Sequence, residues 1–282
     1  INMTFHNEIG SEYDRVKRIS KIATKIAALI GANKKDVKVA ASLCKLDLVS
    51  EMVFEFPELQ GVMGKYYALE SGFPEEVAEA CLEHYSPKGP FDSVPENLTS
   101  ISIALADKID LITNFWAINL KPTGSKDPYA LRRASIGVIR IILERGLDVS
   151  LLSLVNLGNE DIDLPDLIKF FKERVRVHFI EKGIQNDIIS ACFAVSGQDF
   201  KILDLYERAL AISEFVNTEL GRDLVQTYKR ANNILTLEER KDGVEYSLDP
   251  QLQLMKEEPE RTLFNHLMVI DNDIERELKE KN

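Results

Sequence analysis

The chain has 282 residues, of which 45% are hydrophobic and 29% are charged, and its formal net charge is -11 at pH 7. This balance is typical of a soluble globular protein with enough core for two domains, and it excludes a disordered chain. The overall field repels polyanions, so any binding of nucleic acid requires local basic patches.

The spacing of the cysteines and the length of the apolar runs indicate the cellular compartment in which the protein is expected. Cys44, Cys81 and Cys192 are far apart and each lies among apolar residues, which predicts buried free thiols in a reducing compartment. No apolar run approaches the roughly 20 residues that span a bilayer, and no signal peptide is visible. We therefore expect a cytoplasmic protein that binds no membrane. Because Ile1 already lies within what reads as structured sequence, we also expect the chain to be part of a longer protein.

Helical periodicity dominates the chain and strand-like alternation is nearly absent, so an all-α fold is predicted. Gly31 is expected to end the first helix, and Asp127 and Pro128 to cap and begin a central buried one. Residues 86–95 hold three prolines and a glycine and are predicted to form a loop. In the first half of the chain, the expected helices are 12–30, 36–54, a short one closing at Gly72, 74–85, 98–115 and 128–145.

The second half is also predicted to be helical, after a connection over residues 146–163 that contains the domain boundary. In the helix 222–235, the expected core stripe is Leu224, Tyr228, Ala231 and Leu235. The expected helices here are 165–182, 186–195, 200–219, 222–235, 251–268 (interrupted near Pro259) and 271 to the end.

Two short patterns invite a chemical interpretation. Thr123-Gly124-Ser125-Lys126 is similar to the end of a phosphate-binding loop, but the earlier glycine and the preceding strand of that motif are missing. We expect a rigid loop leading into a capped helix. Asp47, Glu51 and Glu55 fall at i, i+4 and i+8 on one face of a predicted helix. Such carboxylates can do acid–base work or bind metal, but a solvated acidic face is favoured because nothing else converges on them.

The segment Ala40–Asp47 resembles the helix that carries the His-Asp doublet in the HD family of helical metal-dependent phosphohydrolases. The doublet is missing, and Lys45 places a cation near the position of the metal. His84 and Asp107 resemble the later ligands of that site, but two ligands do not hold a catalytic divalent ion. We predict a vestigial HD-like site with no metal and no catalytic residue. The plainer alternative is that His84 is a helix-end residue and Asp107 a surface acid.

Three groups of basic and amide side chains are candidates for contacts with RNA. One group follows residue 120, the second shares a face of the helix 165–182, and the third shares a face of the helix 222–235. Such side chains neutralise phosphates and read base edges, although each group taken alone is more often an ordinary wet surface. The candidates are Lys121, Lys126, Arg132, Arg133, Lys169, Lys172, Arg176, Gln226, Lys229, Arg230 and Asn233.

Two stretches are too idiosyncratic for generic helical sequence. They are Asp47–Ala68, around Glu-Phe-Pro-Glu-Leu-Gln-Gly at 55–61, and Leu120–Ile142. Both closely resemble the beta subunit of the bacterial two-subunit glycyl-tRNA synthetase. Weaker, collinear similarity comes from Glu207–Leu210, Tyr228–Leu235 and Leu267–Val269.

The resemblance implies the C-terminal portion of that subunit. The implied fold is all-α with two helical domains: an HD-like domain with a degenerate metal site at 1–155, then a helical-bundle anticodon-binding domain at 160–282. The implied function is to bind tRNA(Gly) and position it for ATP-dependent glycylation on the alpha subunit, which is the other implied partner; no DNA is implied. ATP and magnesium would act on the alpha subunit, so no cofactor is expected in this chain.

The resemblance also gives the basic groups their expected roles. Lys169, Lys172, Arg176, Lys229 and Arg230 would neutralise phosphates at the anticodon end, and Asn233 would read a base. Lys121, Lys126, Arg132 and Arg133 would mark a second RNA-facing surface or a domain joint. Two alternatives remain open at this point: an HD-type metal-dependent phosphohydrolase, and a scaffold that docks the alpha subunit without touching RNA.

Overall fold

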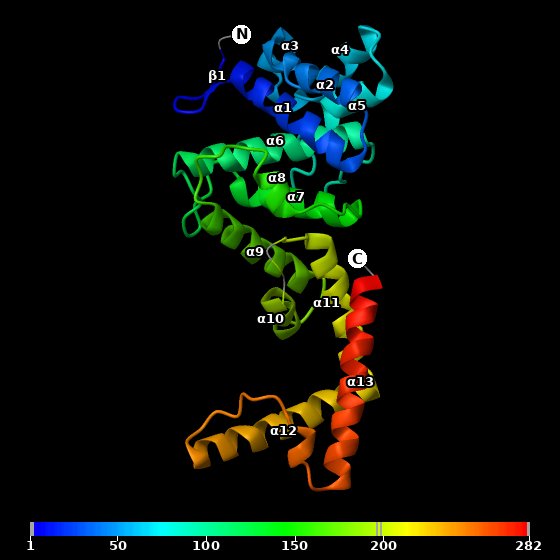
Figure 1. Cartoon of the computed structure of the whole chain (residues 1–282). Coiled ribbons are helices and arrows are strands. Elements are labelled where there is room, and N and C mark those ends of the chain that lie inside the picture. Colours follow the sequence, from blue (N-terminus) through cyan, green and yellow to red (C-terminus); the bar gives the residue numbers. More distant parts are fainter. Residues whose placement is uncertain (1–2, 196, 198, 281–282) are drawn as a thin grey trace. The chain divides into compact units, whose positions relative to one another are not determined.

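The computed structural model describes residues 3–195, 197 and 199–280. Apart from a small hairpin, β1 (Thr4–His6) and β2 (Gly10–Ser11), the regular elements of this described part are helices (Figure 1), so the all-α prediction is confirmed. Packing divides the chain into two compact units, of which the first ends at Asn217 and the second begins at Thr218. None of the described helices is long and apolar enough to cross a membrane.

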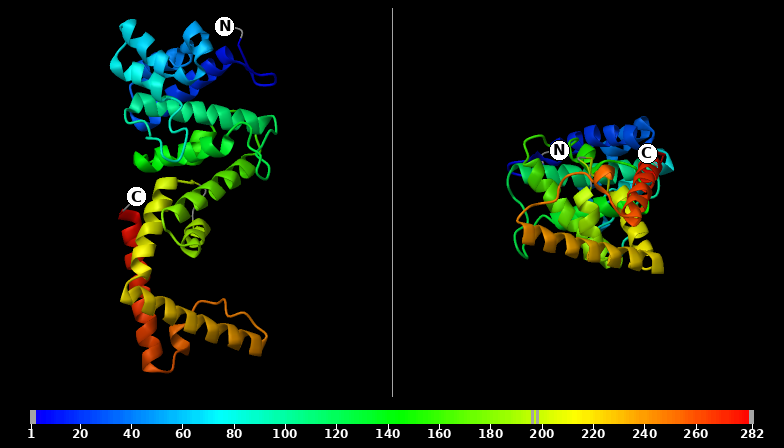
Figure 2. Two further views of the ribbon diagram at one scale, coloured as in Figure 1. Left: turned by 180° about the vertical axis from the view of Figure 1, so that it is seen from behind. Right: turned by 60° about the horizontal axis from the view of Figure 1, so that its bottom comes forward.

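The first unit is built around the helix α6 (Leu98–Ala117), which is buried over most of its length. The helices α1 (Glu12–Ile30), α2 (Lys34–Leu43) and α5 (Glu75–Glu83) pack on one side of it, and α7 (Leu131–Glu144) on the other (Figures 1 and 2). Asp107, Lys108 and Asp110 of α6 are buried together with its apolar residues. Buried charges need partners, so this helix determines where the polar centre of the unit lies.

The first helix shows how local signals fix an element. Ser11 caps α1 by accepting a hydrogen bond from the Asp14 amide while the Asp14 carboxylate accepts one from the Ser11 amide. Gly31 ends the helix in a left-handed conformation, with φ of 76°, which glycine adopts without a steric penalty. The predicted range 12–30 is confirmed. The range 186–195 is confirmed as α10 (Asn186–Val195).

The predicted helix 36–54 is wrong. After α2 the chain turns, forms the short 3-10 helix η1 (Leu46–Val49), and then forms α3 (Glu51–Glu55). Asp47 therefore does not share a helix face with Glu51 and Glu55, and it is not solvated. Its buried carboxylate accepts hydrogen bonds from the backbone amides of Gly61 (2.6 Å) and Gly64 (3.2 Å), at the start of α4 (Val62–Glu70). A further 3-10 turn, η2 (Pro57–Leu59), lies between α3 and α4.

The buried helix α7 begins three residues later than predicted. Asp127 does cap it, because its two carboxylate oxygens accept hydrogen bonds from the amides of Leu131 (2.9 Å) and Arg132 (3.0 Å). Pro128 lies before the helix, since Ala130 takes a left-handed conformation with φ of 55°. The prolyl residue thus belongs to the turn that leads into the helix.

The remaining helices of the first unit continue the same core. They are α8 (Leu151–Val155), α9 (Leu164–Glu181), α10 and α11 (Ile202–Val216), and both α9 and α11 pack against α7. One cluster of buried side chains runs from Ile19 to Ala209, across the predicted boundary at 155–160. The assignment of 1–155 and 160–282 to two kinds of domain stays a prediction, whereas the packing division falls at Asn217.

The second unit holds α12 (Glu219–Asp242), the 3-10 turn η3 (Leu252–Leu254) and α13 (Glu258–Glu280). The predicted core stripe of α12 is wrong: Leu224 is 57% and Tyr228 69% exposed, because no described element covers that face. The predicted break in the last helical stretch is also wrong. Pro259 is the second residue of α13, a position where proline is tolerated, and the helix continues through 268–271.

Candidate functional site

Asp107 and Lys45, which were expected at a vestigial HD-like site, belong to a cluster of buried ion pairs. Asp107 extends from α6, and its Oδ1 atom lies 3.0 Å from Arg15 Nη2 of α1 and 2.9 Å from Lys45 Nζ. Lys45 lies in the turn after α2 and is buried. The prediction that Lys45 brings a cation to this position is confirmed, and the alternative that Asp107 is a surface acid is wrong.

The charges of this cluster stabilise one another. Burial by itself raises the pKa of Asp107, but the nearby Arg15 and Lys45 outweigh it and hold that pKa well below its usual range. Burial likewise opposes the charge on Lys45, yet Asp107 raises the pKa of that ammonium. One turn along α6, Asp110 lies 2.6 Å from Arg18 and 3.7 Å from Arg15. The Asp107 carboxylate is thus committed to two cations of its own chain.

His84 caps the end of α5 and is completely buried. Its Nδ1 atom lies 2.8 Å from the carbonyl oxygen of Cys81, which makes Nδ1 the protonated donor, while Nε2 has no hydrogen-bond partner in the described part of the chain. Burial, followed by the charge of Lys45, lowers the pKa of His84 well below its usual value, so the ring is neutral. Among the described residues, no three His, Cys, Asp or Glu side chains come close enough to hold a metal ion.

Lys108 connects this cluster to the loop 86–95. Its buried ammonium donates hydrogen bonds to the carbonyl oxygens of Tyr85 (3.2 Å) and Ser86 (2.8 Å). Burial lowers the pKa of Lys108 to about 8. Gly137 of α7 leaves room for it, because a Cβ atom at Gly137 would lie 2.6 Å from Lys108 Cε. Lys108 therefore fixes the first residues of the loop against α6.

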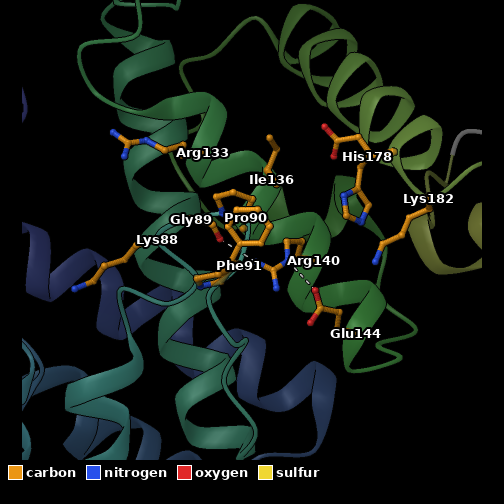
Figure 3. Close-up of a pocket in the computed structure, with 13 residues that line it drawn as sticks. Lys88, Gly89, Pro90, Phe91, Arg133, Ile136, Arg140, Glu144, His178 and Lys182 are labelled. Carbon is orange, nitrogen blue, oxygen red and sulfur yellow. Dashed lines mark hydrogen bonds and ion pairs between the residues drawn. The ribbon is translucent and has the colours of Figure 1, made fainter.

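Two cavities flank the same loop. The first, of about 510 Å³, lies between the loop, α7 and α9 (Figure 3). The second, of about 480 Å³, lies above Asp107 and Lys108, and both are lined by Pro87, Lys88 and Arg133. Sequence reasoning singled out only Arg133 of these. The sequence feature that could have indicated these cavities is Lys88 and Phe91 within the proline-rich loop 86–95.

The candidates after residue 120 lie in different surroundings. Lys121 forms an ion pair of 2.7 Å with Asp166 of α9, and Arg132 donates a 2.6 Å hydrogen bond to the Gly124 carbonyl oxygen. Lys126 and Arg133 are exposed. Lys121 and Arg132 thus tie the loop to its neighbours, while Lys126 and Arg133 face solvent.

The three candidates on α9 share one side of that helix but differ in the contacts that their side chains make. Lys169 is exposed, and Lys172 lies with its ammonium 5.2 Å from the centre of the Phe200 ring. Arg176 donates hydrogen bonds to Asn186 and, at 2.8 Å, to the Ser190 hydroxyl of α10. The side chain of Arg176 therefore links two helices.

The candidates on α12 are the most open. All four lie in the middle of the helix, belong to the second unit, and are exposed: Gln226, Lys229, Arg230 and Asn233. Spacings of three, four and seven residues place them on a common side of the helix. An exposed row of two cations and two amides has the chemistry to contact phosphates and base edges.

The fold and the buried charges define a helical protein whose polar centre is a set of ion pairs between its own side chains. The chain belongs to the glycyl-tRNA synthetase beta subunit family, whose model matches residues 1–194. It is 49% identical, over 94% of its length, to the glycine–tRNA ligase beta subunit of Ruegeria sp. (strain TM1040), of which it covers 39%.

Other beta subunits give the same result. The chain is 49% identical to that of Paracoccus denitrificans over 93% of its own length and 38% of the relative. It is 45% identical to that of Dinoroseobacter shibae over 98% of its own length and 44% of the relative. The chain thus spans about two fifths of the length of the curated relatives it matches.

Proposed function

We propose that this chain is the tRNA-binding part of the beta subunit of a glycine–tRNA ligase, and that it positions tRNA(Gly) for glycylation on the alpha subunit. Family membership along residues 1–194, with 45–49% identity over most of the chain, is the observation that carries the proposal. In this proposal the partners are tRNA(Gly) and the alpha subunit, and the location is the cytoplasm. ATP and magnesium act on the alpha subunit, and the contribution of this chain is orientation of the substrate.

The exposed side of α12 supports a direct role in RNA binding. Lys229 and Arg230 neutralise phosphates, and Gln226 and Asn233 present amides to base edges. Lys169 adds an exposed cation on α9 of the first unit. In a chain of net charge -11, these local cations supply the attraction that the whole molecule does not. The assignment of 1–155 as HD-like and 160–282 as anticodon-binding belongs to the same proposal.

The phosphohydrolase alternative is less favoured by the geometry. A metal at the HD-like position needs a free Asp107 carboxylate, and Arg15 and Lys45 both contact its Oδ1 atom. His84 and Asp107 supply two ligand groups, where a catalytic divalent ion takes three or more. The ion pairs therefore support a structural role for this centre.

A tRNA titration at several salt concentrations tests the proposal, with the chain assembled with its alpha subunit. Affinity for tRNA(Gly) should fall as salt rises, because phosphate contacts release counterions. The double substitution Lys229→Glu, Arg230→Glu should weaken binding and reduce the salt slope by about two. Lys34→Glu, Lys35→Glu, which reverses two exposed lysines at the start of α2, is the matched control.

Unchanged affinity of the α12 variant would show that RNA does not contact this side of the helix. If the unaltered assembly bound no tRNA at any salt concentration, the scaffold alternative would replace the proposal.

A further inference from the structure

We infer that the loop 86–95 and the two cavities beside it form a second RNA site, which takes an unpaired nucleotide by stacking its base on Phe91 and holds the adjacent phosphates on Lys88, Arg133 and Lys182. We call this region the Phe91 groove. The inference rests on the proposed function, because it assumes that RNA is the ligand, and it assigns a surface that the anticodon-directed candidates do not include.

The backbone of the loop is fixed from three sides. Lys108 holds its start through the Tyr85 and Ser86 carbonyl oxygens. Arg140 of α7 donates to the carbonyl oxygens of Gly89 (2.9 Å) and Asp92 (2.7 Å), which flank the tip. Arg145 donates to the Val94 carbonyl oxygen at 2.9 Å and holds the end. The tip of the loop is therefore pre-organised, so little conformational entropy is lost when a ligand contacts it.

Phe91 lies at that tip and is 98% exposed. A single exposed apolar side chain is ordinary by itself. This one belongs to a braced loop whose tip lines a cavity, and in Figure 3 it lies between Arg133 and Lys88 on one side and Lys182 on the other. A phenyl ring in this position offers a base a stacking face, and such stacking tolerates any base because each has a π-face.

The groove is positively charged, in contrast to the chain as a whole. Six cations line the two cavities against three carboxylates: Arg15, Lys88, Lys108, Arg133, Arg140 and Lys182 against Asp107, Glu144 and Glu181. Asp107 and Glu144 are paired with cations, with Glu144 2.7 Å from Arg140. Lys88, Arg133 and Lys182 are exposed, and none of the three forms an ion pair with another described residue. These three face solvent at the mouths of the cavities and are placed to meet phosphates.

The dimensions favour an unpaired strand. Cavities of about 510 and 480 Å³ fall in the range of small-molecule sites, so each admits a group of nucleotide size and neither admits a duplex. Sequence-tolerant recognition of unpaired RNA combines aromatic stacking with a cationic track, and both are present here. A double-stranded stem would offer only its backbone to Phe91 and leave the phenyl face unused.

The test uses the chain assembled with its alpha subunit and two probes, a tRNA(Gly) transcript and a short unpaired oligoribonucleotide carrying a photoreactive base. Phe91→Ala should weaken binding of the oligoribonucleotide by about 5- to 150-fold, the range expected for one stacked base. Phe54→Ala is the matched control, because Phe54 is 84% exposed in the same unit and lines neither cavity. Photocrosslinking should attach the oligoribonucleotide to the peptide that contains Phe91.

A charge reversal gives an independent readout. Arg133→Glu should weaken the same probe and lower its salt slope by about one, whereas Lys38→Glu, an exposed lysine of α2, should not. If Phe91→Ala bound the probe as tightly as Phe54→Ala, the Phe91 groove would not be an RNA site. Phe91-dependent binding of a polyglutamate peptide in place of the oligoribonucleotide would also overturn the inference, because it would indicate an acidic protein partner. If the assembly without substitutions bound no tRNA, the proposed function itself would be refuted.

Discussion

Replacing Asp107 with asparagine removes the carboxylate that two buried cations share. Arg15 retains weaker contacts with Asp110 (3.7 Å) and Glu12 (3.6 Å), but Lys45 loses its ion pair. Breaking a buried ion pair by removing one partner costs about 3–5 kcal/mol, and the remaining contacts of Arg15 place this case near the lower end. For a unit of this size, about 3 kcal/mol lowers the midpoint of thermal unfolding by about 6–12 °C.

Fluorescence of Trp116 is the suitable assay, because it is the chain's one tryptophan and lies buried in the first unit. Glu96→Gln is the control: its carboxylate lies 3.4 Å from Arg145 but is 83% exposed, so the loss should be below about 1 kcal/mol. The pH dependence gives a second check. The pKa of Asp107 is lower in the folded state than in the unfolded chain, where it is about 4. The ionised carboxylate therefore stabilises the fold above about pH 4, and this stabilisation is lost as the pH falls further.

The gap in stability between wild type and Asp107→Asn should therefore narrow as pH falls below about 4. A gap at pH 7 no larger than that of Glu96→Gln, or one that does not change with pH, would refute the argument that this carboxylate balances buried cations.

Two further predictions concern packing around α6. The pKa of Lys108 is lowered from 10.5 to about 8, so between these pH values the unfolded chain binds more protons than the folded chain. In denaturant titrations, the free energy of unfolding of the wild type should therefore rise with pH relative to that of Lys108→Met. A difference in unfolding free energy between the two proteins that stays constant or falls as the pH rises would contradict this. Gly158→Ala places a Cβ atom 2.3 Å from Thr113 Oγ1 and should cost about 1–3 kcal/mol of unfolding free energy. Gly197→Ala is the control, because its added methyl meets no atom of the described residues within 4 Å, so it should cost much less. Equal losses for the two variants would argue against a clash at Gly158.

Elements with complete local signals could be predicted from the sequence. The bounds of α1 follow from an apolar stripe, a capping box and Gly31, all of which act within one turn of the helix ends. Lys45 could be placed at the polar centre because its segment resembles a known helix. Arg15 could not, since its partner Asp107 lies 92 residues away and only the packing of α1 on α6 brings the two together.

The errors arose where periodicity along the chain does not determine which long-range contacts form. The i, i+4, i+8 spacing of Asp47, Glu51 and Glu55 fits one helix, but Asp47 instead binds the amides of Gly61 and Gly64, and a helix through this residue could not turn to reach them. The stripe of α12 predicts an amphipathic helix, and it does not tell whether anything covers the apolar side. The Phe91 groove depends on three distant cations that hold carbonyl oxygens, and no spacing in the sequence reveals that.

The ammonium of Lys45 has a consequence for how this fold depends on its surroundings. The cation that pairs with Asp107 is part of the polypeptide, so every copy of the chain carries it. No chelator can strip it, and no competing ion can exchange for it. The charge balance at Asp107 is thereby written into the polypeptide itself and does not depend on an ion taken up from the medium.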